Sequence, residues 1–220
     1  MPHTIALKLK PETYQQFQEI YTQLNAGEKN NLAKPLGENL ADIACEVIDQ
    51  VFGQMVTLSS SGDKESEKVL GQILDTLRKY MPWSVSFFGN ERLIPMVNYL
   101  ENLIEVKDGQ NYLTYQVDHH LITELLGHVE HIKQERDQYI IPALKAFTQV
   151  VDQGVTSLIR EPKKMLKFNL VVDKTLNGVI NVTTQLGYKR FDKLGTMYDA
   201  KTLSQFFEHF LNFLNAEPKN

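Results

Sequence analysis

The chain has 220 residues, of which 42% are hydrophobic and 23% are charged, and its net charge is −4 at neutral pH. This composition argues against wholesale disorder, and the small negative charge argues against a general attraction to nucleic acid. The sequence contains no run of about 18 apolar residues, so we expect no transmembrane segment.

The single cysteine, Cys45, excludes an intrachain disulfide and is typical of a protein in a reducing compartment. The first residues hold no apolar stretch long enough for a secretion signal, so we expect a cytoplasmic protein. The length fits one domain, and we expect residues 1–220 to form a single α-helical domain.

The first two helices are predicted near the start of the chain. Residues 3–10 alternate apolar and polar side chains, which is a weak strand pattern. Pro11 suits the first turn of a helix, and Gly27 ends that helix. A second amphipathic helix is predicted over residues 40–55.

A third helix follows a break in the chain. Residues 59–62 (SSSG) form the break, and Asp63 is placed to cap the helix that follows. Pro82 is expected to stop this helix, because proline cannot donate the backbone hydrogen bond.

An aromatic connector, residues 82–93, comes next and holds the single tryptophan. In one interpretation Trp83, Phe87 and Phe88 form an exposed anchor for a partner or an apolar ligand. In the other they fill the end of the helical bundle, because large aromatic side chains are mostly interior. Pro95 then starts a fourth helix.

Residues 104–117 predict two short extended segments. They lie on either side of Asp108-Gly109, a dipeptide that favours a tight hairpin turn. We expect this small β-hairpin to be the extent of the sheet.

The longest amphipathic run extends from Asp118 to Ile159. Asp118 is placed to cap its first turn, and apolar residues then recur on one helical face. Pro142 predicts a kink or a restart within the run.

Residues 166–187 fit two structures. The many β-branched residues and the pair Asn177-Gly178 are compatible with a hairpin. The apolar residues fall within one arc of a helical wheel, however, and we prefer a helix, which Gly178 would weaken by about 1 kcal/mol.

A last helix follows Asp199 and carries phenylalanines on one side. Its apolar face predicts packing against other helices or against a second copy in a dimer. Together the patterns predict an all-α bundle of about seven or eight helices. The candidate partner surface consists of Trp83, Phe87, Phe88, Phe206, Phe210 and Phe213.

A stripe of metal-ligand side chains follows one face of the run from Asp118. Imidazole and carboxylate groups four residues apart are neighbours on a helix and are ligands for zinc, iron or manganese. The alternatives are a solvated helix surface and a pH-responsive surface. The stripe consists of His120, Glu124, His128, His131 and Glu135.

The segment 160–193 is basic, with eight Lys and Arg residues against three Asp and Glu residues. It is a candidate for contact with a lipid or another anionic surface, and less so with nucleic acid. The alternative is the ordinary charged outer face of a bundle helix. The candidate contact residues are Lys163, Lys164, Lys167, Lys189 and Arg190.

No catalytic motif is evident. Cys45 lies in an apolar helix, which would raise the pKa of its thiol, and no phosphate loop or nucleophile elbow is present. We therefore expect a non-enzymatic protein without a cofactor that acts by binding a protein or ligand. A divalent-metal protein and a peripheral binder of an anionic surface are the alternatives. A bundle of this kind can also enclose an apolar pocket, which the sequence does not reveal.

Overall fold

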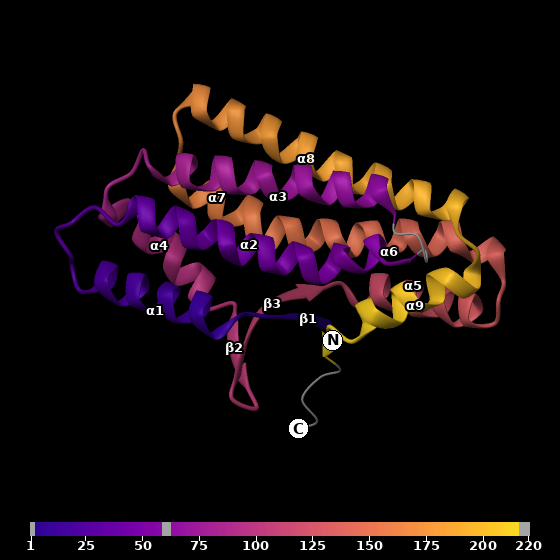
Figure 1. Ribbon diagram of the computed structural model, residues 1–220. Coiled ribbons are helices and arrows are strands. Elements are labelled where there is room, and N and C mark those ends of the chain that lie inside the picture. Colours follow the sequence, from indigo (N-terminus) through magenta and orange to yellow (C-terminus); the bar gives the residue numbers. More distant parts are fainter. Residues whose placement is uncertain (1–2, 59–62, 216–220) are drawn as a thin grey trace.

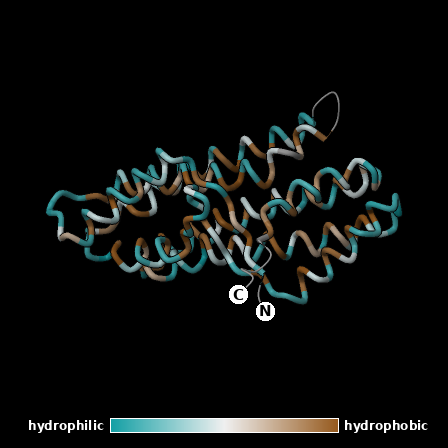
Figure 2. Tube along the Cα trace, turned by 90° about the horizontal axis from the view of Figure 1, so that it is seen from below, coloured by the Kyte–Doolittle hydropathy of each residue, from teal (hydrophilic) through white to brown (hydrophobic). Residues whose placement is uncertain are grey.

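The computed structural model describes residues 3–58 and 63–215, and the break predicted at residues 59–62 lies outside this part of the chain. Long helices lie side by side along the molecule, and a small antiparallel sheet packs against them (Figure 1). Hydrophobic and hydrophilic residues alternate along these helices (Figure 2), as in amphipathic helices that share a core. The predicted helical bundle is confirmed.

The helices differ in length, and three of them join end to end. The π-helical turn η2 connects α6 to α7 without a break, so the described residues form eight separate α-helical rods, as predicted. The bounds are α1 (Pro11–Asn25), α2 (Ala33–Val56), α3 (Lys64–Val85), α4 (Asn90–Glu101), α5 (His119–Lys133), η1 (Asp137–Tyr139), α6 (Ile140–Val155), η2 (Thr156–Arg160), α7 (Glu161–Leu166), α8 (Leu170–Met197) and α9 (Ala200–Leu211).

The sheet contains the predicted hairpin and two further strands, in the order β2-β3-β1-β4. Asp108 and Gly109 both have positive φ angles, 52° and 71°, as a tight hairpin turn requires. The weak alternation at the start of the chain forms a strand that pairs with β3, with Ile5 opposite Tyr115. The strands are β1 (His3–Lys8), β2 (Ile104–Lys107), β3 (Gln110–Val117) and β4 (Leu214–Asn215).

Side-chain caps fix several helix starts. Asp63 accepts hydrogen bonds from the backbone N–H groups of Glu65 and Ser66, at 3.2 and 3.1 Å. Asp118 caps α5 in the same way, so both predicted caps are confirmed. Asp199 also caps α9, by accepting a hydrogen bond from the backbone N–H of Thr202, a cap that was not predicted from the sequence. Each carboxylate satisfies N–H groups that have no partner within the helix.

Residues 170–187 are helical, as preferred from their periodicity, and belong to α8, whereas residues 167–169 form a short connection after α7, with Lys167 at a positive φ of 49°. Asn169 caps α8 by accepting hydrogen bonds from the first-turn N–H groups of Val171 and Val172. This cap and the packing of the apolar arc stabilise the helix by more than the lower helix propensity of the β-branched residues destabilises it.

Pro82 and Pro95 do not mark helix ends where the sequence predicted, whereas the restart predicted near Pro142 is found. Pro82 lies inside α3, which continues to Val85, because a proline so near the helix end removes a single hydrogen bond. Pro95 lies inside α4, which begins earlier, after Gly89. The long central run breaks before Pro142, which occupies the first turn of α6, where its missing N–H would have no partner within the helix.

The core is continuous from the sheet to the helices and is centred on Phe147 of α6. This ring makes edge-to-face contacts with Phe191 of α8 at 4.8 Å and with Phe210 of α9 at 4.7 Å. Tyr115 and Ile5 of the sheet are buried in the same core. The C-terminal helices are therefore tied to the middle of the chain by aromatic packing.

Candidate functional site

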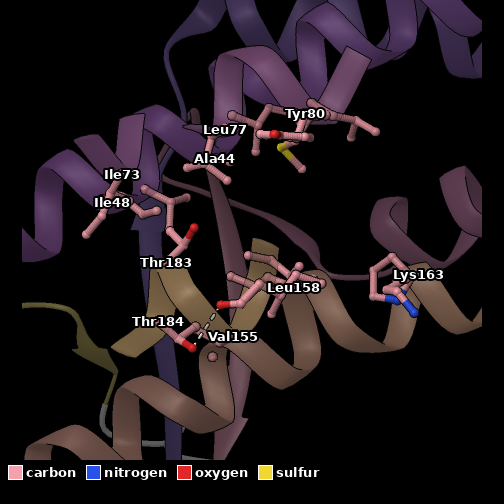
Figure 3. Close-up of a pocket in the computed structure, with 18 of the residues that line it drawn as sticks. Ala44, Ile48, Ile73, Leu77, Tyr80, Val155, Leu158, Lys163, Thr183 and Thr184 are labelled. Carbon is pink, nitrogen blue, oxygen red and sulfur yellow. Dashed lines mark hydrogen bonds between the residues drawn. The ribbon is translucent and has the colours of Figure 1, made fainter. Parts of the chain in front are cut away.

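An apolar cavity lies beneath α8, between that helix and the helices α2, α3 and α6–α7. Its volume is about 210 Å³. In Figure 3, Thr183 of α8 lies opposite Ile48 of α2 and Ile73 of α3, with Val155 and Leu158 of α6–η2 forming another wall. Apolar surroundings of this kind favour an apolar ligand over water.

The cavity is elongated along the helix axes. Its lining residues on α8 extend from Leu176 to Tyr188, which corresponds to about 18 Å at 1.5 Å per residue. The lining residues of α2, from Leu40 to Phe52, cover the same number of helical steps. A long ligand that lies along the helices fits this extent.

The two ends of the cavity are defined by close approaches between helices. At one end, a Cβ on Gly187 of α8 would lie 3.2 Å from the ring of Phe52 on α2. At the other end, a Cβ on Gly37 of α2 would lie 2.5 Å from the Cα of Pro82 on α3. These helices therefore approach each other closely at the two ends of the cavity.

The C-terminal half of α8 is anchored by buried charges. The guanidinium of Arg190 forms an ion pair with Asp63, and its Nε donates to Ser66 Oγ at 2.6 Å. Burial alone would raise the pKa of Asp63, but hydrogen bonds from Ser66 and Arg190 outweigh it and hold that pKa below its ordinary value. Asp63 is therefore ionised at neutral pH and holds α8 against the start of α3.

The N-terminal half of α8 has fewer attachments. Leu170 and Val171 in its first turn are 79% and 74% exposed. Asp173 forms an ion pair with Lys163 of α7, which lies at this end of the cavity. The helix is thus fixed firmly at the Arg190 end and more loosely at the end where Lys163 lies.

Most polar groups on the cavity wall are satisfied within the protein. Thr184 Oγ1 donates to the carbonyl of Ile180 at 2.9 Å, and Ser84 Oγ donates to that of Met81 at 2.8 Å. The Tyr188 hydroxyl donates to Asp152 at 2.6 Å, and burial, together with this carboxylate, raises its pKa. Among the described lining residues, the one charged side chain is that of Lys163 (Figure 3).

The predicted metal stripe does not form one helical face. Helix α5 ends at Lys133, and Glu135 lies beyond it with a positive φ of 57°, because the chain turns there toward α6. The prediction was therefore wrong in placing Glu135 on the same helix as His120.

The remaining members of the stripe meet in part. The distance from His128 Nε2 to Glu124 Oε1 is 3.7 Å. His131 stacks on Tyr139, and its Nδ1 lies 3.2 Å from the guanidinium of Arg136, a cation that opposes the approach of a metal ion. Within residues 3–58 and 63–215, no three His, Cys, Asp or Glu side chains are grouped to hold a metal. Metal binding at the stripe stays a prediction.

The basic segment 160–193 does not present one charged surface. Arg190 is 1% exposed, and the side chain of Lys163 is 13% exposed, because each is paired with an acidic residue and packed between helices. The prediction that these two side chains contact an external surface was therefore wrong. The members left exposed are Lys164, Lys167 and Lys189.

The phenylalanines of α9 belong to the core. Phe206 and Phe210 are each 1% exposed because they pack around Phe147, so they cannot form the predicted partner surface. Phe213, beyond the end of α9, is half-buried against Phe210.

The aromatic connector divides between core and surface. Phe88 is buried against the ring of Phe168 at 4.9 Å. Trp83 and Phe87 are 36% and 50% exposed, with their rings edge to face at 5.0 Å. A partner contact at this exposed pair stays a prediction.

Sequence reasoning allowed for an apolar pocket but did not locate the cavity or identify the role of α8 in covering it. The available signal was the apolar arc of residues 166–187, which carries small side chains such as Thr183 where a packed helix usually has leucine. Such an arc leaves space between helices, but the space itself depends on how the helices are held apart.

Comparison of the chain with protein-family models, curated proteins and solved structures gave no match. No helix among the described residues is long and apolar enough to cross a membrane. The cavity therefore carries the functional argument.

Proposed function

We propose that the protein binds a long apolar molecule in the cavity beneath α8 and acts without catalysis. The observation that carries this proposal is the elongated cavity of about 210 Å³ with apolar walls. A ligand that fills it recovers van der Waals contacts and removes apolar wall from water.

The attachment of α8 supports a route for the ligand. The helix is held at its C-terminal half by Arg190, whereas Leu170 and Val171 in its first turn are exposed, and Asp173 supplies the one ion pair of the N-terminal half among the described residues. Movement of the N-terminal half exposes the cavity while the Arg190 anchor stays in place. Segments with few buried contacts open at lower free energy than the packed core does.

The non-enzymatic part of the proposal rests on the state of the one thiol, which is not among the residues that line the cavity. Cys45 is buried, and desolvation raises the pKa of its thiol, which keeps it protonated. A lone cysteine of this kind also supports a reducing compartment such as the cytoplasm. Both statements belong to the proposal.

Binding can be tested with N-phenyl-1-naphthylamine, a neutral apolar dye whose fluorescence rises when it leaves water. We expect the purified protein to bind the dye at one site. Thr183→Phe places a ring in the cavity and should weaken binding at least tenfold. Val182→Phe is the matched control. Val182 is next to Thr183 in the sequence but is 63% exposed on the outer face of α8, so a ring there does not enter the cavity.

Circular dichroism of both variants establishes that each is folded before the dye is added. Equal dye affinities for Thr183→Phe and Val182→Phe, or no binding by the unaltered protein, would contradict the proposal.

A further inference from the structure

Lys163 is an unusual member of an apolar cavity wall. Its side chain is 13% exposed, and it lies at one end of the set of lining residues (Figure 3). A long apolar stem followed by an ammonium group is suited to the point where a ligand changes from apolar to polar. The other described lining residues are uncharged.

The ammonium group has capacity beyond its present partner. Lys163 Nζ donates to Asp173 Oδ1, and it lies 5.9 Å from the centre of the Phe168 ring. An ammonium has three N–H donors, and Asp173 is the one hydrogen-bond acceptor that the described residues supply to it. Two donors therefore remain for a second acceptor at the end of the cavity.

The opposite end of the cavity differs in chemistry. There Phe52 closes against Gly187, and the hydroxyl of Tyr188 is engaged by Asp152. Burial and the Asp152 carboxylate raise the pKa of Tyr188, so this hydroxyl is neutral. The cavity is thus apolar at one end and bordered by the Lys163–Asp173 ion pair, with its spare N–H donors, at the other.

From this polarity we infer that the ligand is a single-chain amphiphile with an anionic head group, which pairs with Lys163 while the chain extends toward Phe52. The inference rests on the proposed function and specifies its ligand class. The about 18 Å between Leu176 and Tyr188 accommodates an extended long alkyl chain. The head group shares the ammonium with Asp173 at the loosely held end of α8.

The test compares three probes with the same alkyl chain: hexadecanoate, hexadecyl phosphate and hexadecan-1-ol, each displacing N-phenyl-1-naphthylamine at mildly alkaline pH. We expect at least one anion to bind about tenfold more tightly than the alcohol, as a charge-assisted hydrogen bond implies. The order of the two anions distinguishes a carboxylate from a phosphate head group.

Two variants locate the effect. Lys163→Met keeps the apolar stem and should reduce anion affinity to that of the alcohol, while the alcohol itself still binds. Asp173→Asn removes a competing negative charge and should strengthen anion binding. Lys164→Met is the matched control, because Lys164 is exposed and pairs with Glu161 in the same helix.

Each outcome bears on a different statement. If the unaltered protein binds alcohol and anions equally, the head-group inference is overturned and the apolar-ligand proposal remains. If Lys163→Met keeps the anion preference, Lys163 is not the partner. If Lys163→Met does not fold, unchanged anion affinity in Asp173→Asn also overturns the inference. If the dye and all three probes fail to bind, the proposed function itself fails.

Discussion

Arg190 of α8 and Asp63, the cap of α3, form an ion pair whose side chains are 1% and 4% exposed. The pair lies 127 positions apart in the sequence and joins the helix that closes the cavity to one of the helices that form its wall. Removing one member leaves the other charged and buried, which is more costly than the loss of the contact itself.

We expect Arg190→Met to lower the free energy of unfolding by about 3–5 kcal/mol, because the carboxylate of Asp63 loses its main partner in a desolvated site. Lys189→Met is the control, since Lys189 is the exposed neighbour on the same helix and should change stability by less than about 0.5 kcal/mol. Urea unfolding followed by circular dichroism gives both values. Similar values for the two variants would show that the ion pair does not anchor α8.

The same pair predicts a pH dependence. The pKa of Asp63 is lower in the folded protein than in the unfolded chain, because hydrogen bonds from Ser66 and Arg190 outweigh the opposing effect of burial. The stabilisation is therefore fully present above the unfolded pKa of about 3.9 and is lost as pH falls toward the folded value.

Asp63→Asn isolates this contribution, because asparagine keeps the helix cap and does not ionise. We expect the variant to be less stable than the unaltered protein at neutral pH and the difference to shrink below about pH 4. Urea unfolding at a series of pH values measures the difference. A difference that stays constant through the acid range would contradict the assignment.

Hydrogen exchange should resolve the two halves of α8. We expect amides near Leu170–Gly178 to exchange faster than those near Gly187–Leu194. The first group starts at the exposed side chains of Leu170 and Val171, whereas the second surrounds the buried Arg190 and Phe191. Binding of an apolar ligand should slow exchange in the first half more than in the second. Uniform protection along the helix would exclude movement of one half about the other.

The sequence predicted the helices well because their apolar periodicity survives in the structure, even in α8 with its β-branched residues. It predicted Arg190 to be exposed, because a helical wheel shows only the residues of the same helix. The wheel could not show that Asp63, before a helix distant in the sequence, pairs with Arg190 and buries it. The sequence allowed for an apolar pocket but did not locate the cavity, because the position of the cavity depends on how distant helices pack, as Gly37 does against Pro82, and no local pattern encodes that packing.

The phenylalanines of α9 give a direct test of core against surface. We expect Phe210→Ala to lower the free energy of unfolding by about 3–5 kcal/mol, because Phe210 is 1% exposed and packs on Phe147. Phe87→Ala removes a ring of the same size that is 50% exposed and should change stability far less. Thermal unfolding monitored by circular dichroism compares them. Comparable losses would mean that Phe87 is shielded in solution, as by self-association, which sedimentation velocity detects.

Gly178 offers a way to stiffen α8 without touching the cavity. A Cβ at this exposed helical position would meet no atom within 4 Å, so alanine adds helix propensity without a clash. We expect Gly178→Ala to raise the free energy of unfolding by about 0.4–1 kcal/mol and to slow hydrogen exchange in the first half of α8.

Gly37→Ala is the contrasting control. A Cβ there would lie 2.5 Å from the backbone Cα of Pro82, which cannot yield as a side chain does, so the same substitution should destabilise the protein. If Gly178→Ala leaves hydrogen exchange in α8 unchanged, packing and not helix propensity limits the opening of the first half of the helix. The N-terminal end of α8 is then held more firmly than its few contacts imply.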